Sequence, residues 1–205
     1  MKLDIMPNGL FSSNVYLVSE GKECVVIDCG VKTRDIVRKL EEDGLTVKYI
    51  LLTHGHVDHI FHAATLREAT GASLCLHEAE LELYRDADKN GYSYFGMKRP
   101  LNPPEPDILL KDNETLRLGD EDIQIIHTPG HSPGCICIKI GSWLFTGDTL
   151  FALSVGRTDL YGGNGQMLEA SIQNRIYTLD GSLTVYPGHG QATSIAYEKE
   201  NNPYV

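Results

Sequence analysis

Eight histidines in this 205-residue chain have the types and spacing that point most directly to chemistry. Three fall within the hexapeptide His54-Gly55-His56-Val57-Asp58-His59. Histidines at positions i and i+2 point the same way on an extended chain, whereas Asp58 and His59 begin the next expected helix and face another side of the same pocket. Imidazole nitrogens with a carboxylate oxygen are the ligand mixture that Zn²⁺ and other borderline divalent metals accept. The hexapeptide therefore predicts a metal site.

Three later segments share one pattern, in which an apolar strand is followed by a glycine turn and a candidate ligand. The candidates are His131 after Gly130, Asp148 after Gly147 and His189 after Gly188. Glycine allows backbone conformations that aim a neighbouring side chain inward. All of these candidates can therefore meet the hexapeptide on one edge of the fold.

The elements that must position these residues follow from hydrophobic periodicity. In the first half we expect helices from Thr33 to Gly44, from Ile60 to Gly71 and over 78–85, and strands at 14–18, 23–27, 49–53 and 73–76. In the second half we expect a helix carrying Leu168, Ile172 and Ile176, and strands at 115–118, 123–127, 135–140, 143–146 and 183–186. Strands then helix, twice over, predict two similar halves that stack their sheets and place helices outside. No linker composition divides residues 1–205, so we expect a single domain.

The stretch Lys89–Pro106 has no hydrophobic period. It contains Tyr92, Tyr94, Phe95 and four of the nine prolines. A loop of this length is either disordered or functional, and its aromatic residues favour a lid or a binding loop.

Composition limits the partners and the compartment. The hydrophobic share of 41% and charged share of 22% are typical of a globular protein. The net charge of −10 argues against a nucleic-acid partner, and no apolar run approaches the ~20 residues of a membrane span. The N-terminus lacks the long apolar core of a secretory signal, and the five cysteines are expected to be reduced thiols. We therefore expect a cytoplasmic protein with no membrane partner.

The ordered set of motifs resembles the metallo-β-lactamase fold superfamily over nearly the whole chain. Asp28 in Ile27-Asp28-Cys29-Gly30 matches the first motif of that family, an acidic residue that supports the site without binding metal. The resemblance implies an α/β fold, a four-layer αββα sandwich, with a dinuclear site for two divalent metal ions. One metal would be held by His54, His56 and His131, the other by Asp58, His59 and His189, and Asp148 would bridge them. Zn²⁺ is the first expectation, and Fe²⁺ or Mn²⁺ accepts the same ligands.

This ligand set suits hydrolysis. Two cations lower the pKa of a water shared between them, so that hydroxide exists at neutral pH to attack a carbonyl carbon. A thiolate leaves without being protonated, so a thioester suits a site without an obvious general acid. Asp58 is the residue to nominate as a catalytic base alongside the bridging Asp148, although its place in the motif makes Asp58 a ligand first.

Within the superfamily the chain is similar to the glyoxalase II (hydroxyacylglutathione hydrolase) group in its short bacterial form. The similarity lies in residues 146–151, in Gly156-Arg157-Thr158-Asp159 and in the tail at 200–204. It implies a small-molecule thioester substrate. Arg157 is a candidate for gripping a substrate carboxylate or for an ion pair with Asp159, and Tyr161 is a weaker candidate contact. Longer members carry a C-terminal helical domain that contacts glutathione, whereas this chain ends sixteen residues after His189.

Other interpretations stay open at this point. A persulfide dioxygenase shares the fold and a similar Gly-Arg-Thr-Asp stretch, and uses a single iron on two histidines and one aspartate. Hydrolysis of a lactone or another ester is also open to the same site. His62 lies one helical turn from His59 but is expected on the helix surface, and His77 and His127 are expected to be structural. Neither the oligomeric state nor the acyl group follows from the sequence.

Overall fold

The first half of the chain folds into a mixed sheet of six strands. The computed structural model describes residues 1–97 and 103–205 and orders these strands β1-β2-β3-β4-β5-β6. Their bounds are β1 (Lys2–Met6), β2 (Val15–Glu20), β3 (Glu23–Ile27), β4 (Thr46–Leu51), β5 (Ser73–His77) and β6 (Ile108–Leu110). Pairing is antiparallel from β1 to β3 and parallel from β3 to β6. Side chains alternate between the faces, so that Leu17 of β2 packs in the outer core and Tyr16 in the core between the sheets.

The second half forms another six-stranded sheet, ordered β14-β13-β10-β9-β8-β7. Its strands are β7 (Thr115–Leu118), β8 (Glu121–His127), β9 (Ile136–Ile140), β10 (Trp143–Gly147), β13 (Thr184–Pro187) and β14 (Thr193–Ser194). A small hairpin of β11 (Leu150–Phe151) and β12 (Ser154–Val155) follows β10. Only the β10–β13 pair is parallel within this described sheet.

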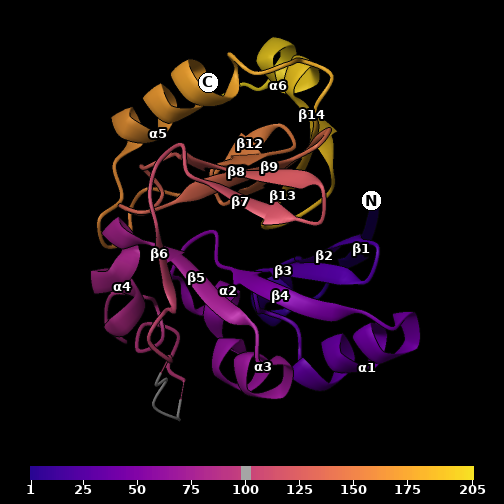
Figure 1. Ribbon diagram of the computed structural model, residues 1–205. Helices are drawn as coiled ribbons and strands as arrows, with labels where there is room; N and C mark the ends of the chain where they lie inside the picture. The colour runs from indigo at the N-terminus through magenta and orange to yellow at the C-terminus, as the bar shows by residue number, and fades with distance from the viewer. Residues whose placement is uncertain (98–102) are drawn as a thin grey trace.

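Helices cover the outer face of each sheet, and the two sheets pack against one another (Figure 1). The helices and turns are η1 (Leu10–Ser12), α1 (Thr33–Asp43), α2 (Val57–Ile60), α3 (Ala63–Thr70), η2 (Glu78–Glu80), α4 (Leu81–Arg85), α5 (Gly165–Ser171), η3 (Ile172–Ile176) and α6 (Ile195–Asn201). One apolar core lies under α1 and α3, a second between the sheets, and a third under α5 and η3. This is the expected four-layer αββα sandwich.

The topology brings the candidate ligands to one edge. Strand β3 runs parallel to β4, and β10 runs parallel to β13, so the carboxyl ends of each pair lie together. Strand β8 has the same direction as β10, because each is antiparallel to β9. The turns that follow these five strands carry Asp28, the 54–59 hexapeptide, His131, Asp148 and His189.

Several expectations about elements need correction. The single helix expected from Ile60 to Gly71 is interrupted: α2 ends at Ile60 and α3 begins at Ala63. The reason is tertiary, because the N–H of His62 donates to the carbonyl of Cys29, and the N–H of Cys29 donates to the carbonyl of His59. Strands β1, β6 and β14 and helix α6 were not expected, because their apolar patterns span only a few residues.

The stretch Lys89–Pro106 agrees with expectation where it is described, since residues 89–97 and 103–106 contain neither helix nor strand. Residues 98–102 of that stretch lie outside the described residues. All five cysteines are buried and free. Across residues 1–97 and 103–205, no helix combines the length and apolar character that crossing a bilayer requires.

Candidate metal centre

The seven predicted ligands converge at the edge of the sandwich where the strands end. Their nitrogen and oxygen atoms form three groups, each with all atoms within 4.8 Å of one another. The groups are His54, His56 and His131; His54, His59 and Asp148; and Asp58, His59 and His189. The first and third are the two sets that the family resemblance assigns to separate metals, and the second joins them through Asp148.

The third group has the separations expected of ligands around one ion. His189 Nε2 lies 3.1 Å from Asp58 Oδ2, and His59 Nε2 lies 3.4 Å from the same oxygen. The two Nε2 atoms are 3.3 Å apart. Donor atoms about 2.0–2.2 Å from a tetrahedral Zn²⁺ lie about 3.3 Å from one another. The side chains therefore fit a divalent cation without rearrangement.

Asp148 lies between the groups. Its Oδ1 is 3.4 Å from His59 Nε2, and its Oδ2 is 3.6 Å from His131 Nε2 and 3.7 Å from His189 Nε2. One carboxylate thus faces ligands of both proposed metals. Gly188 leaves room for the carboxylate of Asp148, because a Cβ at residue 188 would overlap Asp148 Oδ1 and lie 2.8 Å from His59 Cε1.

Three imidazole rings are oriented from behind through Nδ1. His59 Nδ1 lies 2.8 Å from Asp28 Oδ2, and His131 Nδ1 lies 2.7 Å from the carbonyl oxygen of Arg157. His54 Nδ1 lies 3.1 Å from Thr53 Oγ1, whose own proton is donated to Asp28. Each Nδ1–H therefore donates to an oxygen, which leaves the Nε2 lone pair free to bind metal.

Buried polar atoms without partners mark the same place. His54 Nε2, His56 Nε2 and Asp148 Oδ1 are buried and have no hydrogen-bond partner within the described part of the chain. Leaving such atoms unpaired costs free energy, and a cation bound to His54 Nε2 and Asp148 Oδ1 removes that cost at these two atoms. His56 turns its other ring nitrogen, Nδ1, toward the cluster, 2.8 Å from His131 Nε2. The donor set and its unpaired atoms thus fit divalent metal ions.

The electrostatics favour the metal-binding protonation state at His54, His56 and Asp148 and oppose it at His59. Burial lowers the pKa of His54 well below its usual value and that of His56 to about 3, so both rings are neutral. Burial acts to raise the pKa of Asp148, but His59, His131 and His189 outweigh it and hold that pKa at about 2. Burial acts to lower the pKa of His59, but Asp58, Asp28 and Asp148 outweigh it and raise that pKa. A metal ion at His59 must therefore displace a proton.

Asp28 supports His59 from an unusual backbone conformation. Its φ of 63° is in the left-handed region, which directs the carboxylate back toward the 53–59 loop. Its Oδ1 accepts the N–H of Thr53 at 2.8 Å while Oδ2 accepts from His59. This is where the family resemblance placed a supporting acid.

A cavity of about 410 Å³ opens onto the candidate ligands. Its wall is mostly apolar, and its lining residues are Phe11, His56, Asp58, Asn90, Phe95, His131, Asp148, Phe151, Val155, Arg157, Leu160 and His189. Phe95 comes from the stretch expected to be a lid or binding loop, and its ring lies 4.6 Å from that of Phe11.

The two candidate substrate contacts are placed differently. Arg157 lines the cavity, and its Nε also donates to Asp159 Oδ1 at 2.7 Å, so both roles proposed for it are geometrically present. Tyr161 does not line the cavity: its hydroxyl donates to Glu82 at 2.8 Å and its ring lies under the ammonium of Lys89.

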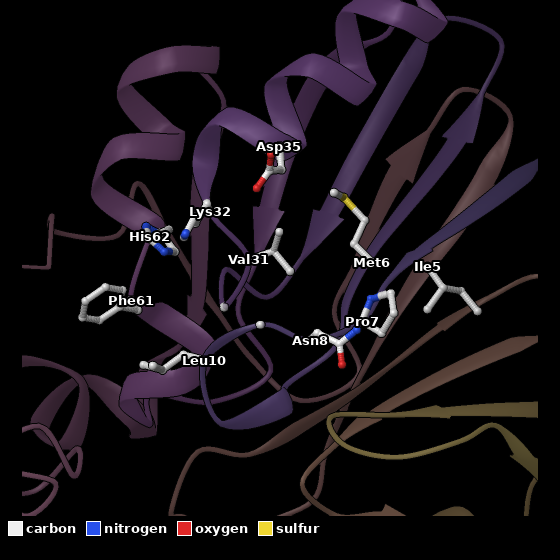
Figure 2. A pocket seen from close by; sticks show the side chains of 12 residues that line it. Ile5, Met6, Pro7, Asn8, Leu10, Val31, Lys32, Asp35, Phe61 and His62 are labelled. Carbon is white, nitrogen blue, oxygen red and sulfur yellow. The ribbon is translucent and has the colours of Figure 1, made fainter.

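The other histidines lie outside the cluster. His62 lines a separate hollow of about 710 Å³ together with Leu10, Lys32 and Phe61, and its ring lies beside Lys32 (Figure 2). His77 and His127 stack on one another with ring centroids 4.1 Å apart, as expected of structural residues.

Sequence reasoning missed residues that position the ligand loops. The amide of Asn14 donates to the carbonyls of Pro187 and Gly190, on either side of His189. The buried carboxylate of Glu80 accepts the N–H groups of Gly55 and Gly134, which lie in two other ligand loops. No short spacing joins these residues to their partners, so only the fold reveals them.

The sequence model of the metallo-beta-lactamase superfamily matches residues 8–189. The probable metallo-hydrolase YqgX of Bacillus subtilis is 35% identical, with 100% of this chain and 98% of that protein covered. Hydroxyacylglutathione hydrolase GloC of Haemophilus influenzae is 32% identical, with 100% and 98% covered.

Among solved structures, the BLEG-1 B3 metallo-beta-lactamase has a TM-score of 0.93 and 36% identity, with 99% of each chain covered. TTHA1623, in a di-iron-bound form, has a TM-score of 0.87 and 36% identity, with 98% of this chain and 100% of that chain covered. Similar chains therefore include metallo-hydrolases and a protein that binds two irons.

Proposed function

The chain belongs to the metallo-β-lactamase superfamily, and from that premise we propose that it is a metal-dependent thioester hydrolase acting on an S-hydroxyacylglutathione. The coarser assignment, a metallo-hydrolase, rests on the family and on the ligand cluster. The thioester and its glutathione part are supported by the cavity and by the similarity to hydroxyacylglutathione hydrolase GloC.

Each proposed ligand is assigned to one of two cations or to both. His54, His56 and His131 would hold one cation, Asp58, His59 and His189 the other, and Asp148 would reach both. Two divalent cations in this setting supply an activated water and stabilise negative charge on a carbonyl oxygen. Zn²⁺, Fe²⁺ and Mn²⁺ all accept these donors, and the di-iron-bound relative keeps iron among the candidates.

The observation that carries the thioester is that the described lining of the cavity contains no spare acid. Among the described lining residues, every histidine and every carboxylate belongs to the ligand groups. Ligand carboxylates are ionised and ligand imidazoles have no proton on the metal-facing nitrogen. No described lining group can therefore protonate a leaving group, and a thiolate is a leaving group that departs without a proton.

The apolar wall and one arginine fit the rest of the substrate. Phe11, Phe95 and Phe151 exclude water around the reacting carbonyl, which strengthens electrostatic interactions there. The guanidinium of Arg157 offers paired donors to a carboxylate such as those of glutathione, in exchange for Asp159.

One sub-cluster favours a second candidate activity. His54, His59 and Asp148 form a set of two histidines and one carboxylate, the ligand set of many mononuclear iron oxygenases. A persulfide dioxygenase would use that set with a single iron and consume oxygen. Lactone hydrolysis would use the whole cluster.

Three parallel assays test the proposal on purified protein of known metal content. We expect thiol release from S-lactoylglutathione, with little oxygen uptake on glutathione persulfide and slow turnover of a simple lactone. Asp148→Asn should lower thioesterase turnover by about 10³-fold or more, because several kcal/mol of charge stabilisation are lost. Asp122→Asn, an exposed carboxylate on β8 paired with Arg117, is the matched control and should leave turnover unchanged. Oxygen consumption without thiol release from the thioester would overturn the assignment.

A further inference from the structure

A buried carboxylate outside the ligand set connects two of the ligand loops. Glu80 lies in η2 and is fully buried. Its Oε1 accepts the N–H of Gly55 at 2.9 Å, and its Oε2 accepts the N–H of Gly134 at 2.6 Å. Gly55 lies between His54 and His56, and Gly134 follows His131 by three residues. One carboxylate thus joins the two loops that carry the three histidines of the first metal group.

The glycines show how closely these loops pack on the segment around Glu80. A Cβ at position 134 would lie 2.5 Å from the backbone nitrogen of Glu80 and 2.6 Å from its Cβ. A Cβ at position 55 would lie 2.9 Å from a methyl group of Leu83 and 3.1 Å from the Cα of Tyr84. Both loops therefore press their backbones against residues 80–84, and only glycine permits the approach at Gly134.

An ion pair does not explain this carboxylate within residues 1–97 and 103–205, because no Lys, Arg or His there forms a salt bridge with Glu80. Burying a carboxylate without a cation is costly, and two backbone N–H groups offset only part of that cost. The loop of His131 has a second connection to this part of the chain. The carbonyl of Pro133 in that loop accepts a hydrogen bond from the ring of His127, and this ring stacks on His77, which directly precedes η2.

We propose that Glu80 is a positioning residue that fixes the separation of the 54–56 and 131–134 loops and so sets the affinity of the His54, His56 and His131 metal position. This inference rests on the proposed metal centre. The other position has support that does not involve Glu80, because Asp28 orients His59 and Asn14 holds the loop of His189. The two positions are therefore separable by mutation.

Glu80→Gln is the direct variant. A carboxamide keeps the size of the side chain but has one acceptor oxygen, so its NH₂ group must face the N–H of Gly55 or of Gly134. One loop then loses its anchor. In a calorimetric titration of the metal-free protein with Zn²⁺, we expect two sites in the native protein. In the variant, one site keeps its affinity and the other weakens by about 10–100-fold.

His189→Ala identifies the weakened site, because it removes a ligand of the other position. His189→Ala alone should keep one site of native affinity. Glu80→Gln combined with His189→Ala should show only the weakened site. Gly134→Ala, which forces Glu80 and its loop apart, should reproduce the same selective loss if Glu80→Gln folds poorly.

Glu198→Gln is the matched control for loss of a buried carboxylate. Glu198 is also fully buried and accepts from Leu153, Thr193 and Asn202, none of which is a proposed ligand or belongs to the 54–56 or 131–134 loop. The Glu198→Gln variant should have a lower thermal stability than the native protein and unchanged affinities for both Zn²⁺ ions. Two sites of native affinity in Glu80→Gln, or equal weakening in Glu198→Gln, would overturn the role of Glu80. Absence of Zn²⁺ binding by the native protein would instead overturn the metal centre itself.

Discussion

At the scale of single residues, the cluster is organised by groups behind the histidines. Asp28, Thr53 and the carbonyl of Arg157 each accept from an imidazole Nδ1, which directs Nε2 toward the other ligands. The motif spacing predicts the seven side chains that face the cluster, and the family resemblance adds Asp28. It does not reveal the backbone carbonyl of Arg157, because a carbonyl carries no sequence signal.

Arg157 offers a prediction at this scale. Its carbonyl orients His131, while its guanidinium lies at the cavity and pairs with Asp159. Arg157→Ala keeps the carbonyl and removes only the guanidinium, so we expect KM for S-lactoylglutathione to rise about 5-fold with kcat little changed. Asp159→Asn should have the opposite effect on KM, because it frees the guanidinium for the substrate. Steady-state kinetics of both variants check this, and a matching fall in kcat for Arg157→Ala would show another role.

At the scale of elements, short turns place the ligands. Helix α2 has four residues, and hydrogen bonds from the 28–30 turn end it at Ile60, which keeps Asp58 and His59 in the cluster and turns His62 toward a different hollow. The periodicity of residues 60–71 predicted one continuous helix. A local pattern contains no information about the peptide groups of Cys29, in the turn after β3, which compete for the backbone hydrogen bonds of His59 and His62. The 77–85 segment likewise supports the site only because Glu80 contacts the 54–56 and 131–134 loops, which are distant in sequence.

The stack of His77 on His127 gives a pH prediction for this segment. His77 Nδ1 accepts the N–H of Ala79, and burial lowers the pKa of His77 from its usual 6.5 to about 4. The folded state thus favours the neutral ring, so this stabilisation is complete above about pH 6.5 and is lost as pH falls toward 4.

His77→Asn retains an acceptor for Ala79 but cannot titrate. We expect the variant to be less stable than the native protein at pH 7, with the difference narrowing by pH 4.5. Urea unfolding at both pH values measures this difference in stability. The histidines other than His127, which stacks on His77, cancel because both proteins contain them in the same surroundings. An equal difference at the two pH values would rule out titration of His77 as the cause.

At the scale of the whole molecule, two stacked sheets bring five turns to one edge, and these turns carry Asp28, the 54–59 hexapeptide, His131, Asp148 and His189. The alternation of strands and helices predicted the layers, and strand ends predicted where the ligands meet. The sequence did not predict edge strands β1, β6 and β14, whose short patterns gain stability only by pairing with a neighbour. It also did not predict Glu80 or Asn14 as anchors, because their partners lie 25 to 176 positions away.

The most direct test of the account is the anomalous scattering of crystals grown with Zn²⁺. The seven side chains predict two strong peaks about 3.5–4 Å apart, one on each set of three ligands, with Asp148 between them. A single peak on His54, His59 and Asp148 would contradict the dinuclear centre and support the mononuclear alternative. No peak at these residues would contradict the metal-dependent mechanism as a whole.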